Sequence, residues 1–225
     1  MEMTTRSYRN LQKAGSAAAL YVAASMLAAM AYFLLIARIP DGATPAEKLA
    51  ALAVLRSGQY IMTLAVYVVF GLALVVLAAA LRGRIGGGAD ALMKVATPIA
   101  FIWSGLLIAS GMVFNVGMES CLALMRSDPA QAAALWAPVE LVSSGLSGNG
   151  EVVGGSWMLL VSLAALRTKS LPVALNILGL VVAAVGISSV VPALKDLAGG
   201  FGLGQAAWCT WLGIALFMGG REARA

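Results

Sequence analysis

Long apolar runs with almost no charged residues dominate the pattern of hydrophobic and polar positions along this chain. A helix that crosses a bilayer needs about 20 mostly apolar residues, and only helices or closed barrels satisfy backbone polar groups in lipid. Barrel strands alternate over about ten residues, whereas these runs are continuous and longer. The pattern therefore predicts an all-α polytopic membrane protein, a single transmembrane domain over residues 1–225, with six transmembrane helices at 14–37, 58–81, 95–117, 151–166, 171–194 and 202–219.

Two helix-start motifs lie between these runs and predict two short interfacial helices on the outer surface. Thr44 to Glu47 form a capping box with proline at the first helical position, and Asp128 followed by Pro129 is a second N-cap signature. Apolar residues at helical spacing follow each motif. We expect the first helix to lead into the second span. The second lies on the membrane or dips into it, with a bend or a late start at Pro138.

The composition excludes an ordinary soluble domain. Of the 225 residues, 61% are hydrophobic and only 11% are charged, and the mean hydropathy is +0.91. An average soluble domain is about 45–50% apolar and about 25% charged, so these few charges cannot cover a globule of this size. A disordered chain and a disulfide-stapled secreted module are excluded as well, because each needs a different composition.

Basic residues gather in alternate loops and predict the orientation. Cytoplasmic loops carry an excess of Lys and Arg. The net charge of +5 therefore indicates the orientation in the membrane rather than a surface that binds nucleic acid. We expect both termini in the cytoplasm of a bacterial-type inner membrane, with the first span retained because it is longer than the apolar part of a signal peptide. The basic residues on the predicted cytoplasmic side are Arg6, Arg9, Lys13, Arg82, Arg84, Lys94, Arg167, Lys169, Arg221 and Arg224.

Several loops and side chains limit the chemistry that we expect. The loop 82–94, which contains Gly86 to Gly88, is predicted to be a flexible cytoplasmic turn, and it matches no phosphate-binding pattern. The chain has no histidine, which excludes serine–histidine catalysis, His-rich di-iron sites and bis-His haem. We predict no catalytic residue, no metal site and no cofactor. Cys121 and Cys209 either pair or, as we favour, remain free buried thiols.

Acidic and aromatic residues collect at the outer ends of the predicted spans, whose centres lack Lys, Arg, Asp and Glu. One interpretation is an interfacial aromatic belt with its acids in water. The other is an outward-facing, apolar-walled pocket closed by the loop 118–150, whose carboxylates bind a cation or pair with arginines. Asn176 is expected to make an interhelical hydrogen bond. The candidate ligand-binding residues are Glu119, Glu140, Glu151, Arg56, Asn115 and Trp157.

An ordered set of short motifs resembles one bacterial membrane family. The set comprises Ala14-Gly15 after a basic tail, Arg56-Ser57-Gly58, Ala80-Leu81-Arg82, Ser127-Asp128-Pro129, Gly155-Ser156-Trp157 and Leu171-Pro172. Together they resemble the six-span inner-membrane family of unknown function catalogued as domain of unknown function forty-three eighty-six. The resemblance covers nearly the whole chain and implies a six-span fold, with no activity and no catalytic residue to transfer.

Three function classes remain. The first is a non-enzymatic membrane protein, either an accessory subunit or a binder of an apolar ligand, because few buried charges and many small residues suit tight packing. The second is a small secondary transporter that uses the outer acidic pocket. The third is a membrane enzyme that uses an outer-face carboxylate. The expected partners are the lipid bilayer, an apolar small molecule or a membrane protein, with a homo-oligomer as an alternative and no nucleic acid.

Overall fold

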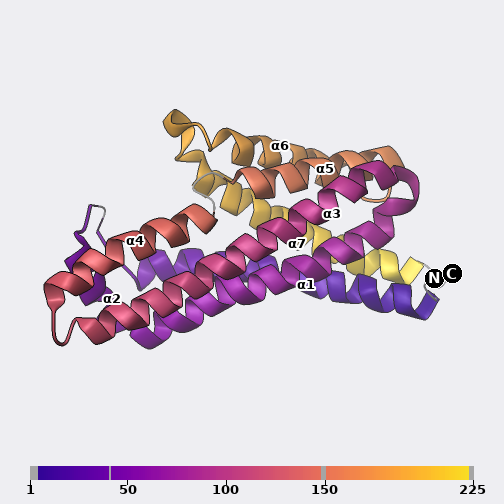
Figure 1. Ribbon diagram of the computed structural model, residues 1–225. Coiled ribbons are helices and arrows are strands. Elements are labelled where there is room, and N and C mark those ends of the chain that lie inside the picture. Colours follow the sequence, from indigo (N-terminus) through magenta and orange to yellow (C-terminus); the bar gives the residue numbers. More distant parts are fainter. Residues whose placement is uncertain (1–4, 41, 148–150, 223–225) are drawn as a thin grey trace.

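The computed structural model describes residues 5–40, 42–147 and 151–222, and these residues form helices and connecting turns without any strand (Figure 1). The all-α prediction is therefore confirmed. Arg224 of the predicted cytoplasmic tail lies outside the described residues. The elements are α1 (Thr5–Leu35), α2 (Pro45–Thr63), the π-helix η1 (Leu64–Val69), α3 (Phe70–Leu124), α4 (Pro129–Ser147), α5 (Val152–Thr168), α6 (Val173–Ser188), the 3-10 helix η2 (Pro192–Leu194) and α7 (Leu197–Glu222).

A long antiparallel hairpin of α2, η1 and α3 is the spine of the molecule (Figure 1). Its first limb runs without interruption from α2 through η1 into α3, so the first predicted interfacial helix and the second span are one helix. No stop signal interrupts them, because residues 49–57 are mostly strong helix formers. The limbs meet at Ala89, whose backbone is non-helical (φ −136°, ψ 41°). The chain therefore turns within the predicted loop 82–94, although the glycines at 86–88 are helical and the break follows them.

The π-helix η1 widens the first limb at its middle. The backbone N–H of Phe70 donates to the carbonyl of Ala65, five residues earlier, and the Tyr21 hydroxyl of α1 donates to the same carbonyl at 2.9 Å. Single π-turns are tolerated where a side chain must be redirected, often at functional sites. This turn carries Tyr67, which lines both cavities described below.

Two hydrophobic cores hold the helices together. The larger one joins α1, α3, α5, α6 and α7 and includes Cys209. The smaller one joins α2, the end of α3 and α4, which we call the lobe, and it includes Cys121. Because the cysteines are free and lie in different cores, the expectation of two buried thiols is confirmed.

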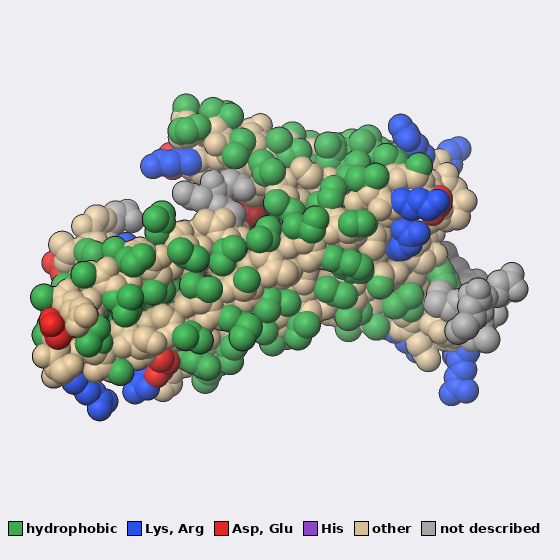
Figure 2. Space-filling model, viewed as in Figure 1, with side chains coloured by type: hydrophobic (Ala, Val, Ile, Leu, Met, Phe, Trp, Pro, Cys, Tyr) green, Lys and Arg blue, Asp and Glu red, His purple; other side chains and the backbone are tan. Residues whose placement is uncertain are grey.

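Several helices are long and apolar enough to cross a bilayer, as expected of a membrane protein. They lie at Arg6–Leu35, Pro45–Leu124 and Leu197–Gly219, and the shorter apolar helix Val173–Ser188 accompanies them. Figure 2 shows hydrophobic side chains along the middle of the molecule and most of the visible charged ones towards its two ends. Both chain ends lie at the end opposite the lobe, which we call the terminal end (Figure 1).

Three expectations about individual helices and their side chains need correction. The predicted span 171–194 is shorter, because α6 ends at Ser188 and Pro192, which lacks an N–H, starts a separate turn. Helix α4 begins at Pro129 and runs through Pro138 to Ser147, so the alternative of a late start at Pro138 is wrong. Asn176 makes no described interhelical bond through its amide nitrogen, which donates instead to the nearby carbonyl of Leu171 at 3.3 Å.

Candidate functional site

A cavity of about 340 Å³ opens between the end of α1, α2, η1, α3 and α4, and we call it the α2–α4 cavity. Phe33, Leu52, Phe114 and Trp136 provide apolar walls. Polar side chains line the cavity from both bordering helices, and Gln59, Thr63 and Tyr67 lie four residues apart, which places them on one side of the helix. These polar residues are Lys48, Gln59, Thr63 and Tyr67 on the first limb, and Glu140, Ser143, Ser144 and Ser147 on α4.

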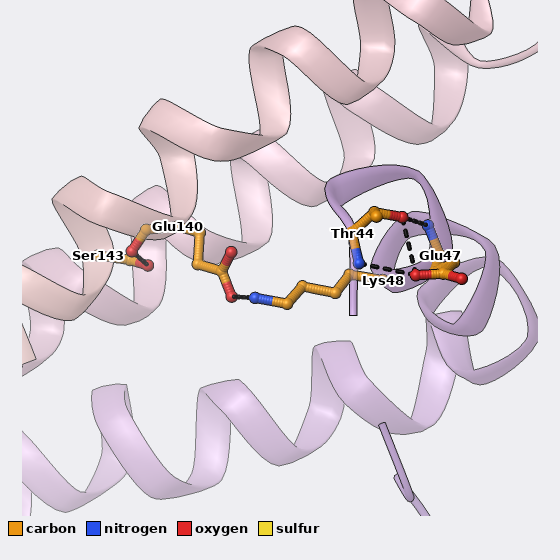
Figure 3. Close-up of polar contacts among 5 residues, drawn as sticks. All are labelled: Thr44, Glu47, Lys48, Glu140 and Ser143. Atoms are coloured by element: carbon orange, nitrogen blue, oxygen red, sulfur yellow. Dashed lines mark hydrogen bonds and ion pairs between the residues drawn. The ribbon is translucent and has the colours of Figure 1, made fainter. Parts of the chain in front are cut away.

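An ion pair bridges the two sides of this cavity (Figure 3). The Lys48 ammonium donates to Oε1 of Glu140 at 2.6 Å, and both side chains are partly exposed. The predicted capping box fixes the start of α2: Thr44 Oγ1 accepts from the Glu47 N–H at 3.3 Å, and the Thr44 N–H donates to Glu47 Oε2 at 2.7 Å. These bonds lower the pKa of Glu47. The cap places Lys48 one residue later, directed towards α4 (Figure 3).

Removing this cap is expected to loosen the lobe side of the cavity. Thr44→Ala should lower stability by about 1 kcal/mol, because an N-cap hydroxyl satisfies an otherwise unpaired helix N–H. Hydrogen exchange should become faster at Glu47 and Lys48, while Thr44→Ser should behave as the wild type. Equal exchange in Thr44→Ala and the wild type would argue against this role of the cap.

Buried hydroxyl and amide groups line the inner wall of the α2–α4 cavity. Ser110 donates to the backbone carbonyl of Ser143 at 2.8 Å and ties α3 to α4. Gln59 donates to Thr63 Oγ1 at 3.3 Å, and both side chains are buried. Polar groups are costly to bury without partners. The wall therefore offers hydrogen-bonding groups at defined positions between apolar surfaces.

A second cavity, of about 190 Å³, adjoins the first, because Tyr67 and Ser147 line both. We call it the Glu151 cavity. Its lining combines aromatic and aliphatic side chains with four oxygen-bearing ones, and Glu151 is the charged member among these described residues. The full lining is Met26, Val66, Tyr67, Phe70, Trp103, Leu107, Ser147, Glu151 and Gln205.

Close packing around the first turn of α5 holds Glu151 in place. The Glu151 N–H donates to Ser189 Oγ at 3.2 Å, and its carbonyl accepts from the Gly155 N–H at 2.8 Å. A Cβ on Gly154 would lie 2.6 Å from the Trp103 ring, and one on Gly155 would lie 2.9 Å from the carbonyl oxygen of Ala183. Only glycine allows this approach, so the sequence of α5 fixes the position of the Glu151 backbone.

Aromatic side chains close the Glu151 cavity towards the terminal end. Trp103 contacts Phe70 with ring centroids 6.1 Å apart and Trp157 at 5.9 Å, and Trp157 contacts Trp208 at 5.9 Å. We call these four residues the aromatic row. Gln205 stands beside it on α7, 1% exposed, and its Nε2 has no hydrogen-bond partner in the described part of the chain. The wall of the cavity beside the aromatic row therefore includes the Gln205 amide nitrogen, which donates to no other described residue.

The structure distributes the six predicted site residues over separate places. Glu140 and Glu151 line the two adjoining cavities. Arg56 and Glu119 form an ion pair in another depression, with Nε to Oε1 at 2.8 Å. Asn115 donates to the Tyr60 carbonyl at 3.2 Å, and Trp157 belongs to the aromatic row.

The Arg56–Glu119 pair is expected to add little stability and to resist mild acid. The hydrogen bond from Arg56 lowers the pKa of Glu119. A carboxylate with a lowered folded-state pKa adds stability above its unfolded pKa, and this contribution is lost as the pH falls through the folded pKa. Both side chains are partly exposed, so the difference in Tm between the wild type and Glu119→Gln should be small at neutral pH and vanish in acid. A difference that grows on acidification contradicts this prediction.

The predicted site did not include several residues that line the cavities, although the sequence contains a pattern that indicates some of them. Gln59, Thr63 and Tyr67 are each four residues apart within an apolar run, so they occupy one helix face. Glu140, Ser143 and Ser147 repeat the pattern on α4. Lys48 and Gln205 carry no comparable signal. Lys48 finds its partner 92 residues away, and Gln205 reaches the cavity only through packing.

Comparisons with known proteins add no chemistry to this site. Among the described residues, no group of three His, Cys, Asp or Glu side chains is arranged to hold a metal ion. The resemblance to the six-span family stays a prediction. No protein-family model, no curated protein and no solved structure matches this chain, so its function is inferred from the geometry of the two cavities.

Proposed function

We propose that this chain is a six-span membrane protein that binds a small amphipathic molecule in the α2–α4 cavity. The crossings are α1, the two limbs of the α2–α3 hairpin, α5, α6 and α7. Both termini face the cytoplasm of a bacterial-type inner membrane, and the lobe lies on the opposite side. The basic residues support this orientation, because Arg82, Arg84 and Lys169 lie beside the terminal end.

One observation carries the proposal: apolar walls and buried hydrogen-bonding groups face the same cavity. Trp136 and Phe114 are in edge contact at 5.3 Å on one wall, and Gln59, Thr63 and Ser143 are buried on the others. Ligand sites combine mostly apolar surface with a few placed polar groups in this way. The Lys48–Glu140 pair adds a charged group of each sign at the same cavity. The lining therefore suits a molecule with an apolar body and a polar group.

Native mass spectrometry of gently extracted protein tests the proposal. Ser144 is exposed and lines the cavity, so Ser144→Trp should fill it without disturbing a core. Val142 is also exposed on α4 but is not part of the lining, so Val142→Trp is the matched control. We expect a stoichiometric small molecule on the wild type and on Val142→Trp, and its loss from Ser144→Trp.

Two results of this experiment contradict the proposal. The first is a small molecule retained equally by all three proteins, which would place the site elsewhere. The second is a stoichiometric protein partner or a bare homo-oligomer without any small molecule, which would favour an accessory subunit.

Secondary transport is the second candidate function, and the closed floor of the Glu151 cavity favours it. Transporter sites lie where helices are interrupted, with access from one side at a time. Here α4 ends at Ser147 and α5 begins at Val152, and the aromatic row separates the cavity from the terminal end. An enzyme receives less support, because Glu119, Glu140 and Glu151 line three different depressions and form no acid–base pair.

Proteoliposomes loaded with a pH-sensitive dye, or in a parallel experiment with a Na⁺-sensitive dye, distinguish transport from binding alone. A transporter should pass protons or Na⁺ in response to an imposed gradient, and Ser144→Trp should reduce that flux while Val142→Trp should not. Absence of any ion-dependent or solute-dependent flux in protein that still binds its ligand contradicts the transport alternative.

A further inference from the structure

We propose that the Glu151 cavity binds the ammonium group of a small organic cation, with the Glu151 carboxylate as counter-charge and the rings of Tyr67, Phe70 and Trp103 around it. The inference deepens the proposed function and rests on it, because the ligand reaches this cavity through the α2–α4 cavity. The two cavities adjoin at Tyr67 and Ser147. The ammonium group is thus the part of the ligand that lies in the inner of the two cavities.

The charge in this cavity is unbalanced. Within the described residues, the Glu151 carboxylate makes neither a hydrogen bond nor an ion pair, although Lys48–Glu140 and Arg56–Glu119 are both paired. The described lining contains no lysine or arginine. An enclosed carboxylate without a partner is costly, and a bound cation supplies the missing charge.

The rings suit a cation with apolar surface. Ammonium groups bind over the faces of Trp, Tyr and Phe, and such aromatic cages recognise alkylated ammonium ions. Tyr67, Phe70 and Trp103 come from η1 and the two limbs of α3, so they border the cavity from both limbs of the hairpin. A Ca²⁺ ion takes six to eight oxygen ligands, and most of this lining is hydrocarbon. The lining therefore favours an organic cation over a bare metal ion.

Gln205 indicates a second feature of the ligand. Its side chain is 1% exposed, lines the cavity and has an Nε2 group without a partner in the described part of the chain. Unpaired buried donors are rare, and a ligand often supplies the missing acceptor. We therefore infer that the cation carries an oxygen acceptor close to its ammonium group.

Isothermal titration of the purified full-length chain tests this inference with three probes. Choline has the ammonium group and a nearby oxygen, 3,3-dimethyl-1-butanol is its neutral counterpart of the same shape, and tetramethylammonium lacks the oxygen. Choline should bind at least about tenfold more tightly than the neutral alcohol, a difference that cation–aromatic and ionic contacts readily supply. Tetramethylammonium should bind between the two.

Matched variants test whether the preference for choline over the neutral alcohol comes from the Glu151 cavity. Glu151→Gln should weaken choline binding by about tenfold or more and leave the neutral alcohol unchanged. Gln205→Leu should weaken choline but not tetramethylammonium. Glu119→Gln, which removes an exposed carboxylate in another depression, should bind choline as the wild type does. Gel filtration and thermal melting verify folding, and Glu151→Asp, which should retain cation selectivity, replaces Glu151→Gln if that variant fails to fold.

The outcomes separate this inference from the proposed function. Equal binding of choline and the neutral alcohol, or unchanged choline binding in Glu151→Gln, overturns the cation site while leaving a ligand-binding cavity. Absence of binding by both choline and tetramethylammonium also overturns it. Choline binding that survives in Ser144→Trp but is lost in Glu151→Gln supports the cation site and contradicts entry through the α2–α4 cavity.

Discussion

Replacing Trp157 by alanine is expected to lower the free energy of unfolding by about 3–5 kcal/mol. Trp157 is 0% exposed and stands between Trp103 and Trp208, each with its ring centroid 5.9 Å away. Truncation removes both ring contacts and leaves a cavity in the larger core. Unfolding followed by tryptophan fluorescence or circular dichroism in mixed micelles measures the change.

Trp211→Ala is the control for this prediction. Trp211 belongs to α7, like Trp208, but is 40% exposed on the surface of the bundle. Its removal should cost much less, because little packing is lost. Equal losses in Trp157→Ala and Trp211→Ala would mean that the aromatic row does not organise the core.

Gly155→Ala is expected to destabilise the protein by about 1–3 kcal/mol, because overpacking forces the backbone to move. The added Cβ would lie 2.9 Å from the carbonyl oxygen of Ala183 and 3.1 Å from the backbone nitrogen of Ile187. Both atoms belong to the backbone of α6, which cannot rotate away as a side chain can. The same shift would move Glu151, so choline binding should fall together with stability.

Gly105→Ala tests the same change where space is open. Apart from its chain neighbours and the backbone of its own helix, no atom lies within 4 Å of a Cβ built on Gly105, which is in the second limb of α3. Alanine is favoured over glycine inside helices, so this variant should be neutral or more stable by up to about 1 kcal/mol. A loss in Gly105→Ala as large as that in Gly155→Ala would show that helix propensity, not packing, determines both.

Local signals in the sequence predicted the features that depend on neighbouring residues. Hydropathy located the apolar helices, and the Thr44 and Asp128 caps start α2 and α4 as expected, with Asp128 Oδ1 accepting from the Gln131 N–H at 2.9 Å. The structure also confirms the expectation that Cys121 and Cys209 are free thiols rather than a disulfide. Each of these features is determined within a few residues, which is why the sequence alone was sufficient.

The candidate site depends on how far the α2–α3 hairpin and α4 extend beyond the start of α5. Hydropathy does not show these relative lengths, so the sequence predicted the site only in part. Glu151 is the N-cap residue of α5, close to the expected start of the fourth span. However, the α2–α3 hairpin and α4 continue past it into the lobe, so Glu151 lies at the bottom of a cavity rather than on an outer surface. The expectation of a separate interfacial helix that leads into the second span missed that the two form one helix, because hydropathy marks apolar stretches and not the point at which a helix ends.

The central claim is that the Glu151 cavity is entered through the α2–α4 cavity from the lobe side, and Ser147 tests it most directly because it lines both. Ser147→Cys in proteoliposomes should react rapidly with a membrane-impermeant methanethiosulfonate reagent applied on the lobe side, and choline should slow the reaction. The native Cys121 and Cys209 are buried and should react slowly. Reaction only from the terminal side, or no reaction from either side, would contradict the account.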